Sequence, residues 1–75
     1  MQKYQNLSGA SNVDSFEMSD NAILVMFKDG SVYLYNTGSP GQYAVDEMKR
    51  LAIAGRGLNS YISRVVKKRY ASKLR

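Results

Sequence analysis

The sequence predicts a small α+β protein: a single domain in which a three-stranded antiparallel β-meander is followed by two α-helices. The chain has 75 residues, of which 44% are hydrophobic and 23% charged, a composition typical of one globular domain. An Asp-Gly pair between two runs rich in β-branched and aromatic residues is typical of a β-hairpin. Two stretches with apolar residues at helical spacing follow. The predicted strands span residues 13–18, 22–28 and 31–36, and the predicted helices span 40–54 and 58–70.

The beginning of the chain is mostly polar. We expect residues 1–11 to form a flexible N-terminus, so that the folded domain spans residues 12–75. In the first predicted strand, Phe16 and Met18 share one side, although the alternation is imperfect. Ser19-Asp20-Asn21 then predicts a turn into the hairpin.

The hairpin around Asp29-Gly30 has two possible registers. A two-residue turn pairs Val25 with Leu34. A three-residue loop, with Gly30 in a left-handed conformation, pairs Val25 with Tyr33 instead. The choice decides which face of the second strand meets the core, because a slip of one residue turns every side chain over.

Neither register gives the hairpin a clean polar face. Apolar residues occupy both sides of the two strands, including the four residues Leu24, Met26, Val32 and Leu34. Either the domain covers both faces of the hairpin, or a second chain covers one of them. This pattern predicts a protein-interaction or homodimerisation module as the alternative function.

The first predicted helix has sequence signals at both ends. Ser39 is suited to the N-cap, Pro40 to the first helical position and Gln42 to a capping box. Gly55 is the expected stop. Asp46 and Glu47 are adjacent, so they point about 100° apart on a helix and do not converge as a catalytic pair.

The second predicted helix is amphipathic. Its apolar arc comprises Leu58, Tyr61, Ile62, Val65 and Val66. Arg64, Lys67 and Lys68 fall on the opposite arc. All six acidic residues precede Met48, whereas nine of the eleven basic residues follow it. A cationic face of this kind is suited to a polyanion such as RNA, where lysine and arginine neutralise phosphates and tyrosines stack on unpaired bases.

The candidate nucleic-acid-binding residues are therefore the cations and tyrosines of this C-terminal part. They are Arg56, Tyr61, Arg64, Lys67, Lys68, Arg69 and Tyr70. Alternatively, the charges form only the solvated face of the helix or contact an anionic membrane surface. Gly55-Arg56-Gly57 is explained by a helix end and a tight turn, although two glycines flanking an arginine can also approach a phosphate.

The residue types present argue against catalysis. The chain contains no cysteine and no histidine, which removes thiolate and imidazole chemistry and nearly all transition-metal sites. We expect no enzyme activity, no cofactor and no metal. The longest apolar run, Ala22–Phe27, has six residues, so we expect no membrane span. No apolar segment of signal-peptide type occurs near Met1, which favours the cytoplasm.

Residues Phe27–Tyr35 resemble the centre of the KTSC domain, a family of small, mostly bacterial proteins named for the C-terminus of some lysyl-tRNA synthetases. The shared features are the Asp-Gly turn, the pair Tyr33 and Tyr35, and the later segment Gly55–Asn59. The resemblance implies the three-residue hairpin loop, with both tyrosines on the face of Val25. They would then pack in the core or, alternatively, form a stacking platform. The family has no established activity, and its synthetase context suggests RNA binding.

Overall fold

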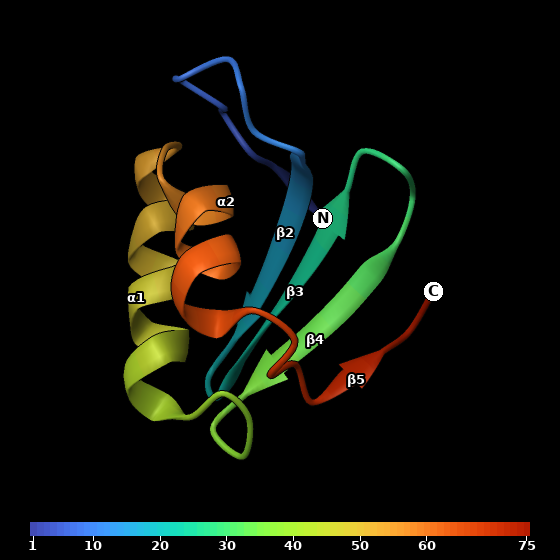
Figure 1. The fold of residues 1–75 in the computed structure, drawn as a ribbon, viewed down its shortest axis with the longest axis vertical. Coiled ribbons are helices and arrows are strands. Elements are labelled where there is room, and N and C mark those ends of the chain that lie inside the picture. Colours follow the sequence, from blue (N-terminus) through green and yellow to red (C-terminus); the bar gives the residue numbers. More distant parts are fainter.

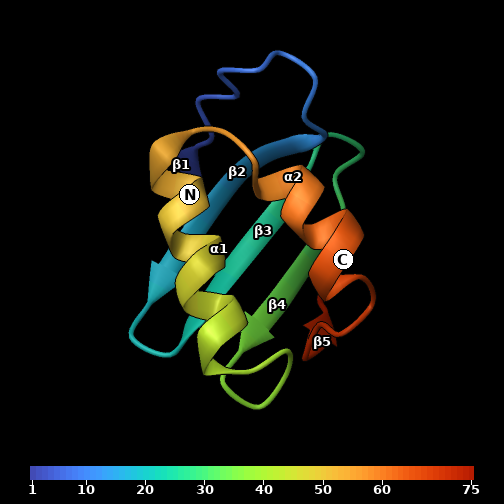
Figure 2. The same cartoon turned by 60° about the vertical axis from the view of Figure 1, so that its left-hand side comes forward.

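The fold has two layers: a five-stranded antiparallel sheet and a pair of helices lying side by side on one of its faces (Figure 1, Figure 2). It is described by a computed structural model that covers residues 1–75. The strands follow the chain order across the sheet and are β1 (Gln2–Lys3), β2 (Val13–Ser19), β3 (Ala22–Phe27), β4 (Val32–Asn36) and β5 (Ser72–Lys73). The helices are α1 (Gln42–Ala54) and α2 (Leu58–Tyr61), and α2 continues into a π-helical segment, η1 (Ile62–Val66).

The predicted class, a small α+β domain with an antiparallel sheet and two helices, is confirmed. The prediction of a three-stranded sheet is wrong, because each end of the chain adds a two-residue strand to one edge of the meander. β1 pairs with β2 at Gln2↔Phe16, and β5 pairs with β4 at Leu34↔Ser72. Both short strands satisfy backbone groups that an exposed sheet edge would leave free.

The N-terminal segment, expected to lie outside the domain, is built into it. The Tyr4 side chain is only 2% exposed, and its hydroxyl accepts a hydrogen bond from the Leu58 N–H at 3.3 Å. The Leu7 N–H donates to the Gly55 carbonyl at 2.7 Å. Residues 1–11 therefore hold the turn between α1 and α2 against the sheet.

The hairpin adopts the three-residue loop. Val25 pairs with Tyr33, and Gly30 has φ +90° while its N–H donates to the Phe27 carbonyl at 2.9 Å. Glycine suits this position because other residues rarely adopt a positive φ. Tyr33 and Tyr35 consequently face the helices, together with Val25.

A core of apolar side chains fills the space between the sheet and the helices. α1 packs against β3 and β4, and α2 packs beside α1. The sheet contributes Phe16, Ile23, Val25 and Tyr35; the helices contribute Val45, Met48, Leu58, Ile62 and Val66. Burial of this apolar surface is the main stabilising contribution to the fold.

The two ends of α1 differ in how well the sequence predicts them. The predicted Ser39 N-cap is wrong: Gly41 occupies the N-cap, no side chain caps the helix, and the Ser39 hydroxyl donates to the Arg69 carbonyl at 2.7 Å. The predicted end at Gly55 is confirmed. Gly55 has φ +78°, and its N–H donates to the carbonyls of Leu51 and Ala52.

The second helix ends earlier than its predicted limit at residue 70. The Lys67 N–H donates to the Ile62 carbonyl, five residues back, and Lys67 itself has φ +54°. The Arg69 guanidinium then donates to the Val65 carbonyl at 2.8 Å and satisfies one end of the helix. The chain reverses here, and the Ala71 N–H donates to the Leu34 carbonyl at 2.7 Å as the chain enters β5.

Replacement of Gly55 by alanine is expected to destabilise the fold by about 3 kcal/mol, because the strained φ adds to a steric clash. A Cβ at this position would lie 2.7 Å from Gln5 Oε1 and 2.8 Å from Gln5 Cβ. Gly9 has the same φ of +78° with no atom within 4 Å, so Gly9→Ala is a matched control with an expected cost of about 1 kcal/mol. Urea unfolding followed by circular dichroism measures both. Equal losses would contradict this account of the packing between Gln5 and Gly55.

Candidate nucleic-acid interface

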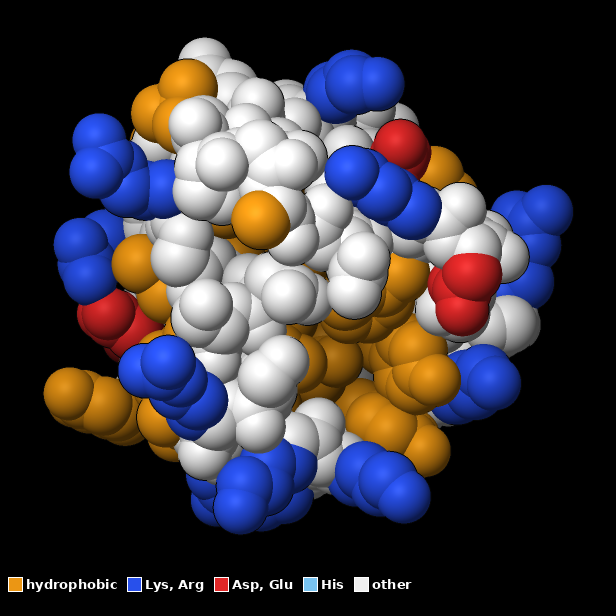
Figure 3. Space-filling model, turned by 45° about the horizontal axis from the view of Figure 1, so that its top comes forward, with side chains coloured by type: hydrophobic (Ala, Val, Ile, Leu, Met, Phe, Trp, Pro, Cys, Tyr) orange, Lys and Arg blue, Asp and Glu red, His pale blue; other side chains and the backbone are white.

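A groove of about 650 Å³ lies on the helix-bearing face of the sheet, between the β3–β4 hairpin on one side and the end of η1 with the following loop on the other. It exists because the chain leaves the helical path at Lys67, so no helix covers this part of β4. Figure 3 shows apolar side chains gathered in a hollow that blue Lys and Arg side chains border.

The floor of the groove is aromatic. The Tyr33 ring stands at its centre, with its centroid 5.6 Å from that of Phe27 and 4.7 Å from that of Tyr70. Tyr35 lies deeper, with its ring centroid 6.5 Å from that of Tyr33. Phe27, Tyr33 and Tyr70 are only partly buried, so they leave apolar ring surface open to a ligand.

Burial keeps the deepest of these rings neutral. Loss of solvent around Tyr35 raises its pKa to about 12, and the neighbouring Tyr33 and Tyr70 hydroxyls contribute in the same direction. An uncharged, apolar floor favours a flat aromatic ligand over an anion. Any anion would therefore sit at the rim.

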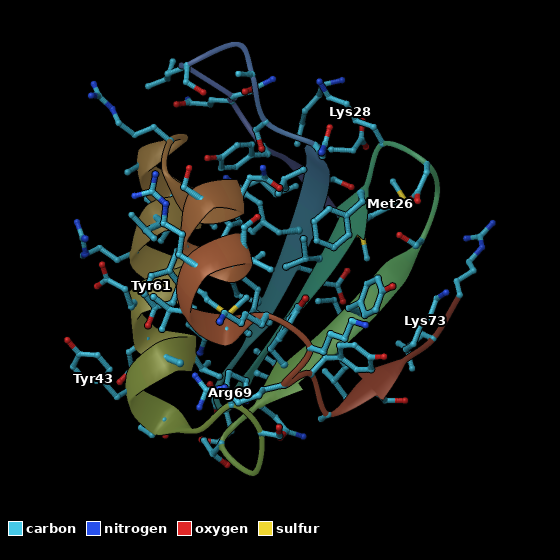
Figure 4. All side chains as sticks on the ribbon, in the orientation of Figure 1. Met26, Lys28, Tyr43, Tyr61, Arg69 and Lys73 are labelled. Carbon is cyan, nitrogen blue, oxygen red and sulfur yellow. The ribbon has the colours of Figure 1, made fainter.

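Lysines supply the charge at the rim. Lys28 enters from the hairpin loop, and Lys67 and Lys68 enter from the opposite wall. Lys73, on β5, places its Nζ 5.7 Å from the centroid of the Tyr33 ring. Figure 4 shows Lys28 at the hairpin end of β3 and Lys73 on β5. The two ion pairs of the protein, Met1 with Glu17 and Arg50 with Glu47, involve none of these lysines, which remain available to an anionic ligand.

Three of the residues predicted from the sequence meet in this groove: Lys67, Lys68 and Tyr70. Tyr70 contacts Tyr33. The sequence placed Tyr33 in the hairpin but did not indicate this contact. A neutral aromatic floor with cations at its edge can hold a planar ring next to an anionic group.

The other predicted residues lie elsewhere. The Arg69 guanidinium is bonded to the Val65 carbonyl. Tyr61 lies on the α1 side of the molecule, where desolvation raises its pKa (Figure 4). Arg56 is exposed between Gly55 and Gly57. Arg64 is exposed on η1 and does not line the groove. The predicted cations thus do not form one continuous patch: Arg56 precedes α2, Arg64 lies on η1, and the chain leaves the helical path at Lys67.

Sequence reasoning missed Lys28 and Lys73 as candidates. Lys28 follows an aromatic residue at the tip of a hairpin whose second strand carries Tyr33, and this proximity is a signal that the sequence offers. No comparable signal exists for Lys73, because its place over Tyr33 depends on a two-residue strand that forms only against β4.

Comparisons with known proteins give no relative: no family model, curated protein or solved structure matches the chain. The resemblance to the KTSC domain stays a prediction, and the geometry of the groove is the basis for inferring a function. None of the helices is long and apolar enough to cross a membrane. No cluster of acidic side chains is arranged to hold a metal ion.

Tyr35 is expected to make stability depend on pH in the alkaline range. Its pKa is about 10 in the unfolded chain and about 12 in the fold, so its contribution is complete below pH 10 and is lost as the pH rises towards 12. Between roughly pH 9 and pH 11.5, wild type should lose about 2 kcal/mol more unfolding free energy than Tyr35→Phe, which has no hydroxyl. Urea titrations at both pH values measure this difference. The same loss in both proteins would show that burial of the hydroxyl has no such effect.

Proposed function

We propose that the protein is a non-catalytic binding module for single-stranded nucleic acid, with RNA as the expected form. The observation that carries this proposal is the groove in which Tyr33 and Tyr70 present ring surface between unpaired lysines. An unpaired base would stack on the rings, and its phosphates would contact the lysines.

Base stacking on the aromatic rings favours a single strand over a duplex. Each base that stacks on an aromatic side chain contributes about 1–3 kcal/mol, and bases in a duplex are not available to a recessed ring. Tyr33 lies inside the groove and not on a flat outer surface. A single strand, whose bases turn outward, can therefore reach Tyr33.

Electrostatics supply the second contribution. Lys67 and Lys68 on one wall and Lys28 on the other lie where the backbone of a bound strand would run. The net charge of +5 also attracts a polyanion at longer range. Each neutralised phosphate of a single strand adds about −0.7 to the slope of log affinity against log salt, so three contacts give a slope of about −2.

We favour binding over catalysis because the groove lacks a pair of acid–base groups. Asp29 is its one acidic residue, and the neighbouring Ser31 hydroxyl donates to that carboxylate. No second carboxylate or imidazole stands beside it to take part in proton transfer.

The double variant Lys67→Ala/Lys68→Ala is expected to bind RNA about tenfold more weakly at physiological salt. The slope of its log affinity against log salt should be shallower by about 1.4, because two phosphate contacts are lost. Arg56→Ala/Arg64→Ala is the matched control: it removes the same charge from exposed positions outside the groove and should change affinity less than about twofold. Fluorescence anisotropy with a short labelled RNA at roughly 50 and 150 mM salt measures both effects. Equal losses in the two variants, or no binding even at low salt, would exclude the groove as the site.

A second candidate function, homodimerisation, has support from the other face of the sheet. Both helices cover one face (Figure 1), and Leu24 pairs with Leu34 on the face that they leave open. Lys3 and Glu17 lie on the same open face, where the Met1 ammonium group pairs with Glu17, so these three groups carry a net charge of only +1. Two copies of a molecule with net charge +5 repel each other least where the local charge is small. We therefore propose a second copy of the chain as the partner for this face.

Leu24→Lys is expected to raise the dissociation constant of such a dimer about tenfold or more, because it buries an unpaired charge. Ala54→Lys adds the same charge at an exposed position at the end of α1 and should leave the dimer unchanged. Sedimentation velocity over a range of concentrations measures the association. A protein that stays monomeric at every concentration would remove this candidate while leaving RNA binding untouched.

A further inference from the structure

The groove contains one group that does not suit a phosphate, the carboxylate of Asp29. It lines the same groove as Lys28, Lys67 and Lys68, yet no ion pair joins it to any of them. In a site that served only to hold phosphates, a carboxylate would weaken binding by repulsion. A ligand that also carries hydrogen-bond donors would instead gain from a carboxylate at this position.

The local geometry holds this carboxylate in one orientation. Asp29 Oδ1 accepts hydrogen bonds from the Ser31 N–H at 2.9 Å and from the Ser31 hydroxyl at 2.6 Å. Both bonds end on the same oxygen, which leaves Oδ2 available to an incoming donor. The Ser31 hydroxyl, and then its N–H, lower the pKa of Asp29, so the group is an acceptor at neutral pH.

Asp29 also lies near the aromatic floor. It belongs to the loop that joins the strands of Phe27 and Tyr33, whose ring centroids are 5.6 Å apart. Lys73, whose Nζ lies 5.7 Å from the Tyr33 ring centroid, is close enough to contribute to the lowered pKa of Asp29. Asp29 and Tyr33 thus line one groove, and a base stacked on Tyr33 would share it with this acceptor.

We propose that Asp29 reads the edge of the stacked base and selects bases with an exocyclic amino group over uracil. This inference rests on the proposed function and names the ligand class of the same groove. Cytosine offers its N4 amino group to a carboxylate, whereas uracil presents a carbonyl oxygen at the same position, which a carboxylate repels. The two pyrimidines have rings of the same size, so stacking alone should distinguish them little.

The test compares oligocytidine with oligouridine of equal length by fluorescence anisotropy. Wild type is expected to bind oligocytidine about tenfold more tightly, the effect of one hydrogen bond to a charged acceptor. Asp29→Asn keeps an oxygen for Ser31 but replaces the free acceptor with an amino donor, so the preference should vanish or turn towards uridine. Asp20→Asn removes the same charge at the β2–β3 turn, outside the groove, and should keep the preference.

The outcomes separate the two proposals. Failure of wild type to bind either oligonucleotide at low salt would overturn the proposed function, and with it this inference. Equal binding of the two by wild type, or a preference for cytidine that persists in Asp29→Asn, would overturn only the role of Asp29.

Discussion

At Lys67 the chain leaves its helical path and turns back towards the sheet, and the groove exists because of this reversal. The turn combines a backbone bond across five residues, from the Lys67 N–H to the Ile62 carbonyl, with a positive φ at Lys67. It carries Tyr70 onto Tyr33, with ring centroids 4.7 Å apart, and leads the chain into β5. A continuous helix to residue 70 would project Tyr70 away from the sheet and leave one edge of β4 open. π-helical segments are often found at functional sites, and here one ends at the wall of the groove.

The two faces of the sheet have different chemistry as a result. On the helix-bearing face, the apolar core gives way to partly exposed aromatic rings bordered by lysines, a combination that suits a planar ring attached to an anionic group. On the open face, Leu24 pairs with Leu34 and no helix covers them (Figure 1). The basic side chains of the C-terminal part therefore differ in their surroundings: Arg69 satisfies helix carbonyls, whereas Lys67 and Lys68 line the groove.

The sequence predicted the features that depend on local chemistry. Asp29-Gly30 indicated the hairpin and Gly55 indicated the end of α1, because both places require a left-handed glycine. Features that depend on contacts between segments far apart in the chain could not be predicted from the sequence. The strands at both chain ends form only against edges supplied by β2 and β4, and the early end of the second helix depends on Lys67. For the same reason, the candidate site was predicted only in part, as residues of one helix and not as a groove shared with the hairpin.

Binding of a single strand of RNA in the aromatic groove is tested most directly by amide chemical-shift mapping with a short unstructured RNA. We predict that the largest shifts occur at Lys28, Tyr33, Lys67, Lys68 and Tyr70, from both walls of the groove at once. Shifts confined to the open face of the sheet or scattered over exposed arginines would contradict binding in the groove. The absence of any shift at low salt would contradict it as well.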